Sequence, residues 1–208
     1  MKTASVTGAS NGIGKAIVDL LKLNQYSVLE FDIERDISVP ENRQYIVNES
    51  IDCDVFINNA WTSTISPESQ LDMFQDFVTA WHDDKDKHII NMGSLMKSTP
   101  QWLIGKANED EDDHQFIDKR RRANIYRVSK KDLYKHTILK HLDASILCKI
   151  SIAQPGFTKT EFAQEYMFSP GRDHQEMIEV MQPAQVARQI LDIIESPVHV
   201  IETSFRLR

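Results

Sequence analysis

Short apolar runs alternate with segments of helical periodicity along most of this chain of 208 residues. The run at 4–6 is followed by apolar positions spaced three and four apart up to Leu21, which places them on one face of a helix. The pattern predicts strands at 4–6, 27–31, 53–57, 88–92, 144–152 and 198–203. It predicts helices at 13–23, 40–49, 67–81, 125–142 and 183–195.

Regular alternation of strands and helices is typical of a parallel sheet that is covered by helices on both faces. The sequence therefore predicts an α/β protein with a Rossmann-type, doubly wound parallel sheet in three α/β/α layers. A chain of this length can bury one core, and we see no internal repeat and no linker, so we expect one domain over residues 1–208.

A glycine-rich turn lies between the first predicted strand and the first predicted helix. Residues 7–14 read Thr7-Gly8-Ala9-Ser10-Asn11-Gly12-Ile13-Gly14. Backbone N–H groups and the helix dipole at such a turn favour a bound pyrophosphate, and glycine lets the backbone approach it closely. The turn alone is compatible with a dinucleotide site or with a tight strand-to-helix connection.

Composition and charge exclude some classes of partner. The net charge is −7, which argues against an electrostatic grip on nucleic acid or on an anionic membrane. Cys53 and Cys148 stand in apolar surroundings without metal-ligand spacing, and we interpret them as buried free thiols in a reducing compartment. We find neither a signal pattern nor a membrane-spanning run, and we expect a cytoplasmic protein.

Candidate chemistry is concentrated in three residues. Tyr126 and Lys130 are four apart in a predicted helix, so the phenol and the ammonium share one helix face. A nearby cation stabilises phenolate and lowers the pKa of a phenol from about 10, which suits general acid/base work. Ser94 follows a predicted strand and Gly93, at the sheet edge where α/β proteins bind ligands.

Taken in order, the motifs of this chain resemble those of the short-chain dehydrogenase/reductase family. They are Thr7-Gly8-x3-Gly12-Ile13-Gly14, Asp32, Asn58-Asn59-Ala60, Ser94, Tyr126-x3-Lys130 and Pro155-Gly156-Phe157-Thr158-Lys159-Thr160. The resemblance implies an NAD(P)-dependent oxidoreductase that interconverts an alcohol and a carbonyl by hydride transfer. Ser94 would hydrogen-bond the reacting oxygen, Tyr126 would move its proton, and Lys130 would hold the nicotinamide ribose.

The resemblance also implies the cofactor contacts. The residues concerned are Gly8, Ser10, Asn11, Gly12, Ile13, Gly14, Asp32, Asp36, Ile37, Asn59, Ala60, Tyr126, Lys130, Pro155, Gly156, Thr158 and Thr160. The carboxylate of Asp32 would bind ribose hydroxyls and repel a 2′-phosphate, which favours NAD(H) over NADP(H), although Arg35 is close in sequence. For Asp36 and Thr158, capping of a loop is the alternative role. No metal site is implied.

The chain departs from the family pattern in several places. Trp61 replaces the glycine that follows Asn-Asn-Ala, and it either narrows the nicotinamide pocket or packs on a shortened helix. No asparagine occurs at 60–90, where the family has a relay asparagine, so Gln70, Gln75 or water could take its place. A charged insertion at about 103–124, acidic and then basic, is expected to be a solvated excursion, and a substrate loop is expected at about 160–182.

Two other functions remain open at this point. The longer stretch between Ser94 and Tyr126 is compatible with a nucleotide-sugar epimerase or dehydratase that retains NAD. The missing relay asparagine is compatible with a non-catalytic dinucleotide sensor that binds a partner protein. For the leading interpretation we expect a small-molecule alcohol or carbonyl substrate, and the family pattern suggests a homo-oligomer.

Overall fold

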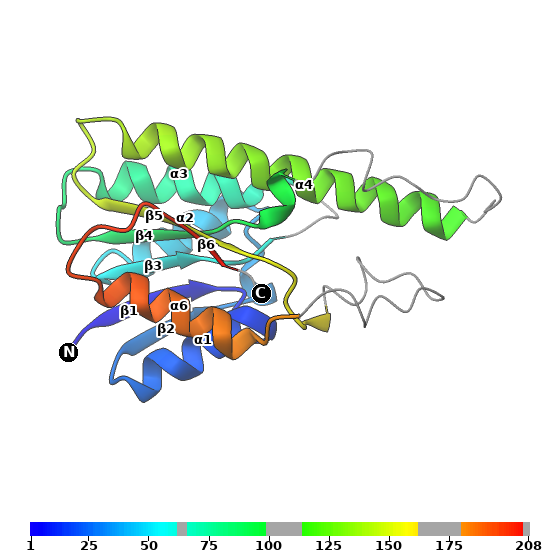
Figure 1. Ribbon diagram of the computed structural model, residues 1–208. Coiled ribbons are helices and arrows are strands. Elements are labelled where there is room, and N and C mark those ends of the chain that lie inside the picture. The colour runs from blue at the N-terminus through cyan, green and yellow to red at the C-terminus, as the bar shows by residue number, and fades with distance from the viewer. Residues whose placement is uncertain (62–65, 99–113, 162–179, 206–208) are drawn as a thin grey trace.

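Six parallel strands form one sheet in the computed structural model, which describes residues 1–61, 66–98, 114–161 and 180–205 (Figure 1). The strands are β1 (Thr3–Thr7), β2 (Ser27–Phe31), β3 (Val55–Asn58), β4 (His88–Met92), β5 (Lys149–Pro155) and β6 (Glu202–Phe205). Their order across the sheet is β2-β1-β3-β4-β5-β6, and every neighbouring pair is parallel. The predicted Rossmann-type doubly wound sheet is confirmed.

The direction of winding reverses between β1 and β3. The chain runs from β1 outward to the edge strand β2 and then returns to the other side of β1, where β3 pairs with it. Two neighbouring strands whose connections leave in opposite directions open a crevice at their carboxyl ends, where doubly wound proteins bind ligands. In this chain those ends are Thr7 and Asn58, so the glycine turn lies at the crevice.

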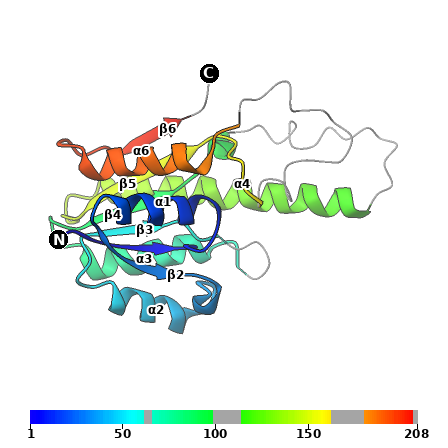
Figure 2. The same cartoon turned by 90° about the horizontal axis from the view of Figure 1, so that it is seen from below.

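Helices cover both faces of the sheet. They are α1 (Gly12–Leu23), α2 (Pro40–Glu49), α3 (Ser69–Trp81), α4 (His114–His141) and α6 (Pro183–Glu195), with short 3₁₀ turns η1 (Ile33–Arg35) and η2 (Leu95–Ser98). Figure 2 shows α1 and α6 together on one face, with α2, α3 and α4 on the other. This arrangement is the expected three-layer α/β/α sandwich.

Each face of the sheet has its own hydrophobic core. On one side Ile17 and Ile190 are buried with Val6 and Ile57 of the sheet. On the other side Phe56 stacks on Phe77 with ring centroids 3.5 Å apart. All residues of β3 and β4 are buried, so these central strands are covered on both faces and show no alternation of buried and exposed positions.

Helix α4 begins earlier than the sequence predicted. We expected it to start at Ile125, whereas it starts at His114 and includes the basic run 119–122. Lysine and arginine favour helices, but they leave no apolar stripe for periodicity to detect. Residues 114–124 are therefore helix rather than a solvated loop, while the remainder of the expected insertion, like residues 162–179 of the expected substrate loop, lies outside the described residues.

The strands β5 and β6 begin several residues later than predicted. β5 begins at Lys149 rather than at residue 144, because the Asp143 carboxylate accepts hydrogen bonds from the Ser145 N–H and hydroxyl and forms a turn there. β6 spans Glu202–Phe205 rather than 198–203. The Val198 N–H donates to the hydroxyl of Ser196, which places a turn ahead of the strand.

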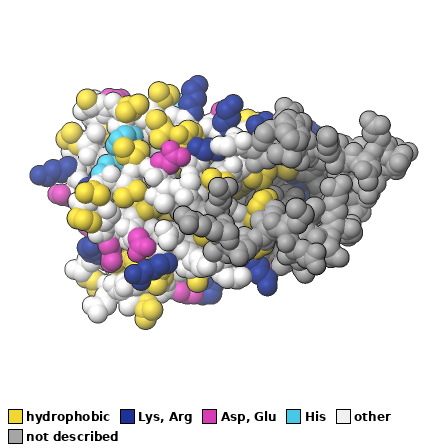
Figure 3. Space-filling model, in the orientation of Figure 1, with side chains coloured by type: hydrophobic (Ala, Val, Ile, Leu, Met, Phe, Trp, Pro, Cys, Tyr) yellow, Lys and Arg dark blue, Asp and Glu magenta, His cyan; other side chains and the backbone are white. Residues whose placement is uncertain are grey.

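The described helices and one face of the surface can be inspected for apolar spans and for the distribution of charge. No helix in the described part of the chain is both long enough and apolar enough to cross a membrane. On the face that Figure 3 shows, basic and acidic side chains are interspersed among the described residues.

Candidate active site

A cleft of about 970 Å³ opens at the carboxyl ends of the strands, at the reversal of winding. It contains most of the residues that the sequence singled out: Gly8, Ser10, Asn11, Gly12, Ile13, Asp32, Asp36, Ile37, Asn59, Ala60, Tyr126, Lys130, Pro155 and Thr160. Gly14, Ser94, Gly156 and Thr158 are not among the described residues that line it. Met92, which sequence reasoning did not consider, also lines it, as do Trp61 and Arg35, whose part in the site the sequence left open.

Two glycines of the turn adopt backbone angles that favour glycine. Gly8 has φ +67° and Gly12 has φ +55°, in the left-handed region. Gly14 is needed for a different reason, because a Cβ built on it would lie 1.9 Å from the carbonyl oxygen of Gly8. Close packing of the turn against the first turn of α1 thus excludes a side chain at this position. The turn leads directly into the N-terminus of α1.

Residues at the ends of β1 and β3 hold the turn in place. The hydroxyl of Thr7 accepts hydrogen bonds from the backbone N–H groups of Asn59 and Ala60, both at 3.1 Å. The Asn59 amide donates to the carbonyl oxygens of Thr7 and Gly8 at 3.0 and 3.2 Å. The role expected of Asn59 was to line the cofactor floor, and the structure adds that its side chain braces the glycine turn.

Asp32 joins the end of β2 to the glycine turn. Its carboxylate accepts the Ser10 N–H at 2.6 Å and the Ile33 N–H at 2.8 Å. Burial acts to raise the pKa of Asp32, but the hydrogen bonds from Ser10 and Ile33 outweigh it, so the net pKa is lowered. The group is a carboxylate at neutral pH, beside the turn that would hold a pyrophosphate.

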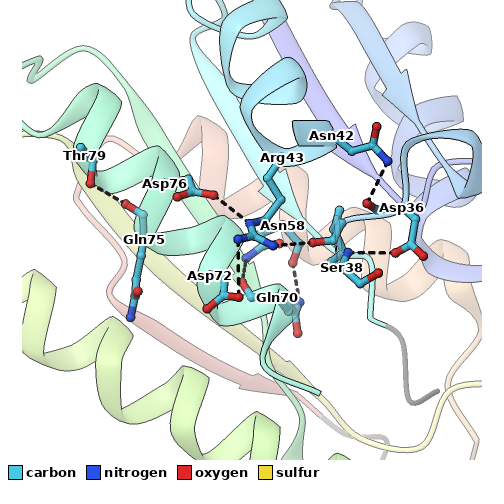
Figure 4. Close-up of polar contacts among 11 residues, drawn as sticks. Asp36, Ser38, Asn42, Arg43, Asn58, Gln70, Asp72, Gln75, Asp76 and Thr79 are labelled. Carbon is cyan, nitrogen blue, oxygen red and sulfur yellow. Dashed lines mark hydrogen bonds and ion pairs between the residues drawn. The ribbon is translucent and has the colours of Figure 1, made fainter. Parts of the chain in front are cut away.

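Arg43 on α2, a residue that sequence reasoning missed, connects the segment at Asp36 and Ile37 to helix α3. Figure 4 shows its side chain beside Asp72 and Asp76. Arg43 on α2 donates to the carbonyl oxygen of Ile37 at 3.0 Å and to the carboxylate of Asp76 on α3 at 2.9 Å. A second α3 carboxylate, that of Asp72, lies 3.7 Å from the guanidinium. Two carboxylates four apart in a predicted helix were the available sign of such a cation.

Asp36 itself uses its carboxylate locally. Its Oδ1 accepts the N–H of Ser38 at 2.9 Å, and its carbonyl oxygen accepts from the Asn42 amide at 3.2 Å (Figure 4). This is the loop-capping arrangement considered for Asp36. Thr158 behaves in the same way, because its hydroxyl donates to the carbonyl oxygen of Gly156 at 3.2 Å and its side chain is buried.

Tyr126 and Lys130 both line the cleft, on one face of α4. The Lys130 Nζ lies 5.2 Å from the centroid of the Tyr126 ring. Ser94, which follows β4, is buried and hydrogen-bonds the Tyr126 side chain. The three residues expected to carry the chemistry are therefore brought together, although Ser94 is not among the described residues that line the cleft.

Burial dominates the electrostatics of this pair. It raises the pKa of Tyr126 to about 12, with the hydrogen bond from Ser94 acting in the opposite direction. Burial also lowers the pKa of Lys130 to about 7. We expected the cation to lower the pKa of the phenol. In this structure desolvation of both groups outweighs that effect.

Trp61 packs against the same helix face. Its ring meets the Tyr126 ring edge to face with centroids 4.8 Å apart, and its indole N–H donates to the Ser129 hydroxyl at 2.9 Å. The side chain lines the cleft beside Tyr126, so it narrows the space around the phenol and also packs on α4. Of the two roles considered for Trp61, the structure supports pocket lining, with α4 as the element it contacts.

Gln70 and Gln75, the two residues considered in place of the relay asparagine, have different surroundings on α3. The Gln70 side-chain oxygen accepts from Lys130 Nζ at 2.7 Å, and Gln70 is buried. Gln75 is exposed, and in Figure 4 it lies apart from Gln70 along the helix. Only Gln70 of these two is in contact with the candidate active site.

The cleft suits a dinucleotide on the evidence of its own shape and groups. Gly8 and Gly12 line the cleft without side chains, where the backbone would meet a pyrophosphate. The turn leads into helix α1, whose dipole favours an anion. The ionised Asp32 offers acceptors for ribose hydroxyls at one end. Lys130 offers an N–H donor at the other end, next to Tyr126.

Solved structures of dehydrogenases and reductases share this fold over nearly the whole chain. A 3-alpha-hydroxysteroid dehydrogenase from Pseudomonas sp., complexed with NADH, is 18% identical with a TM-score of 0.74, covering 98% of this chain and 95% of that chain. A 3-ketoacyl-(acyl-carrier-protein) reductase from Brucella melitensis, complexed with NADH, is 15% identical with a TM-score of 0.69, covering 99% and 96%. A short chain dehydrogenase from Burkholderia cenocepacia, in complex with NADP, is 17% identical with a TM-score of 0.68, covering 97% and 89%.

The predicted resemblance is thus confirmed at the level of the fold. No protein-family model matches the chain, and no curated protein matches its sequence. At identities of 14–18% the structural likeness establishes the architecture of the short-chain dehydrogenases/reductases. The chemistry has to be argued from the residues of this chain.

Proposed function

We propose that the protein is a short-chain dehydrogenase/reductase that uses NAD(H) or NADP(H) to interconvert an alcohol and a carbonyl. The observation that carries the proposal is the joint placement of Tyr126, Lys130 and Ser94 beside a glycine-cradled cleft. The bound nicotinamide would supply or accept the hydride, which none of these side chains can do.

The residues of this chain would manage the oxygen and its proton. The phenol of Tyr126 would donate a proton to the carbonyl oxygen during reduction, and its phenolate would accept the alcohol proton during oxidation. Ser94 touches Tyr126 and would hydrogen-bond the same oxygen. Lys130 would bind the ribose and, once charged, stabilise phenolate through its position 5.2 Å from the ring.

For the cofactor we favour NAD(H). The ionised Asp32 at the end of β2 would accept the ribose hydroxyls and repel a 2′-phosphate. Arg35 also lines the cleft, but its guanidinium lies over the Tyr45 ring, 4.2 Å from the centroid. A cation–π contact of this kind competes with its use as a phosphate ligand.

The substrate that we propose is a small alcohol or carbonyl compound, with Trp61 limiting its bulk beside the phenol. The proposal extends to homo-oligomerisation and a cytoplasmic location, both from the family resemblance and the sequence. No contact among the described residues specifically favours the epimerase or the sensor alternative. The experiment below separates them from the proposed reaction.

A panel of alcohols and carbonyl compounds, followed through NADH or NADPH absorbance, tests the proposal. Replacing Tyr126 with Phe removes the acid/base group, and we expect turnover to fall by about 10²–10⁴-fold while NADH binding is kept. The matched control is Tyr134→Phe, because Tyr134 is on the same helix and contacts Glu202 instead. Equal turnover in Tyr126→Phe and wild type would contradict the assigned role.

A further inference from the structure

Two oxygens inside the protein hold the Lys130 ammonium. Among the described residues its acceptors are the side-chain oxygen of Gln70 and the carbonyl oxygen of Met92, each at 2.7 Å. An ammonium has three N–H donors, so this arrangement leaves one for the cleft that Lys130 lines. The positions of the Gln70 and Met92 oxygens therefore fix the direction of the third N–H of Lys130.

The Gln70 amide has little freedom to turn away. Its nitrogen donates to the Asn58 carbonyl oxygen at 2.7 Å and to the Met92 carbonyl oxygen at 3.2 Å. Both amide hydrogens are used, so the amide oxygen has to face Lys130. A flipped amide would present its nitrogen to the ammonium and lose three hydrogen bonds at once.

The support behind Gln70 is also polar and buried. The side-chain amide of Asn58 donates to the backbone carbonyl oxygen of Gln70 at 2.8 Å and to the side-chain oxygen of Asn91 at 2.9 Å. The Asn91 amide continues to the Thr137 hydroxyl on α4 at 2.9 Å. Gln70 is 2% exposed, and Asn58, Asn91 and Thr137 are 0% exposed.

Burying four neutral polar side chains is costly, and here the Asn58 Oδ1 also lacks a hydrogen-bond partner among the described residues. An apolar core would be the simpler solution for stability alone. The chain of pairs leads from Lys130 through α3, β3 and β4 and back to α4, the helix that carries Lys130. This chain of hydrogen bonds connects the Lys130 ammonium to the strands whose carboxyl ends form the cleft.

We propose that Gln70 is the positioning residue for Lys130. The Gln70 side-chain oxygen accepts one N–H of the buried ammonium and thereby directs the remaining N–H of Lys130 towards a ligand in the cleft. This inference rests on the proposed function for its purpose and on the contacts of Gln70 for its geometry. The groups that meet the ammonium from α3 and β4 are neutral, and the titratable neighbour on α4 is Tyr126.

The charge of Lys130 should therefore respond to Gln70. Replacing Gln70 with Glu places a carboxylate on the ammonium, and we expect the titration midpoint of Lys130 to rise by about one pH unit or more. Replacing Gln70 with Leu removes an acceptor from a buried cation, and we expect the midpoint to fall. A purely structural role would not move the midpoint in opposite directions in the two variants.

The measurement is an NMR titration of isotope-labelled lysine in the free protein, with Lys130 assigned by its loss in Lys130→Arg. Gln75→Glu and Gln75→Leu are the matched controls, because Gln75 is exposed on the same helix, and they should leave the midpoint unchanged. Thermal unfolding of each variant shows that it is folded. If Gln70→Leu does not fold, Gln70→Glu and Gln70→Met carry the same comparison.

Binding of NADH completes the test. We expect Gln70→Leu to weaken NADH binding about tenfold relative to wild type and to Gln75→Leu, because the Lys130 donor loses its orientation. Unmoved Lys130 midpoints together with equal NADH affinity would overturn the proposal. Failure of the wild-type protein to bind NADH or NADPH would instead overturn the proposed function, while the lysine titration would still report on Gln70.

Discussion

At the level of single residues, burial decides which groups are charged. His88 at the start of β4 is an example outside the cleft. Its Nε2 lies 2.8 Å from the Ser151 hydroxyl, and Ser151 in turn donates to the Val200 carbonyl oxygen. Burial, followed by the charges of His199 and Lys149, lowers the pKa of His88 to about 3.

This histidine should make the protein sensitive to acid. An unfolded histidine has a pKa of about 6.5, so below that pH the unfolded chain binds a proton that the folded protein does not. The folded pKa is depressed, and the free energy of unfolding should therefore fall as the pH drops from about 6.5 towards 3, by up to about 1.4 kcal/mol per pH unit.

Replacing His88 with Gln removes the titrating group and keeps an N–H donor for Ser151. Urea unfolding between about pH 6.5 and 5 should show a shallower loss of stability in this variant than in wild type. His82→Gln is the control, because His82 is exposed at the end of α3. An identical slope in His88→Gln and wild type would show that His88 does not bind its proton on unfolding.

At the level of elements, Arg43 joins α2, the Ile37 segment and α3. Its side chain is 13% exposed, whereas the Asp72 and Asp76 side chains are each 40% exposed. We expect Arg43→Met to lower the free energy of unfolding by about 1–3 kcal/mol, because the Ile37 carbonyl oxygen and the α3 carboxylates lose a charged donor. Chemical unfolding measures this.

The same substitution should weaken NADH binding, since Ile37 lines the cleft and its carbonyl oxygen loses an anchor. Arg188→Met is the matched control. Arg188 pairs with Asp192 four residues on along α6, and both side chains are more than half exposed, so the loss should stay below about 1 kcal/mol. Comparable losses in the two variants would argue against a bracing role for Arg43.

Elements with a clear apolar period could be predicted from the sequence, and polar ones could not. α1 and α6 were predicted to within a residue at each end because an apolar stripe faces the core. The start of α4 was missed because residues 114–124 are mostly polar. Similarly, Gln70 could be named as a candidate but not chosen over Gln75, because its contact with Lys130 depends on how α3 packs against α4.

The site residues also differ in whether local sequence explains them. Gly8 and Tyr126 were predictable because local chemistry explains them: a turn next to a helix, and a phenol one helical turn from a lysine. Arg43 and Trp61 act through partners distant in sequence, namely Asp76 and Ser129. Contacts of that kind follow from the tertiary fold and leave no local pattern.

At the level of the whole molecule, strand order explains why one cleft collects these groups. The reversal of winding between β1 and β3 places the glycine turn beside Asn59. Because β4 pairs with β3, Met92 and Gly93 at its carboxyl end line the same cleft. α4 then brings Tyr126 and Lys130 over the same edge. The sequence predicted the class of sheet, but the spatial order of its strands came only from the structure.

The central claim is that this cleft binds a nicotinamide dinucleotide with Lys130 at its reactive end. Calorimetric titration of the wild-type protein and of Lys130→Met with NADH and with NADPH tests it most directly. We predict one site per chain, tighter binding of NADH than of NADPH, and a loss of about tenfold or more in affinity for Lys130→Met. Absence of heat from both nucleotides in a folded wild-type protein would contradict the account.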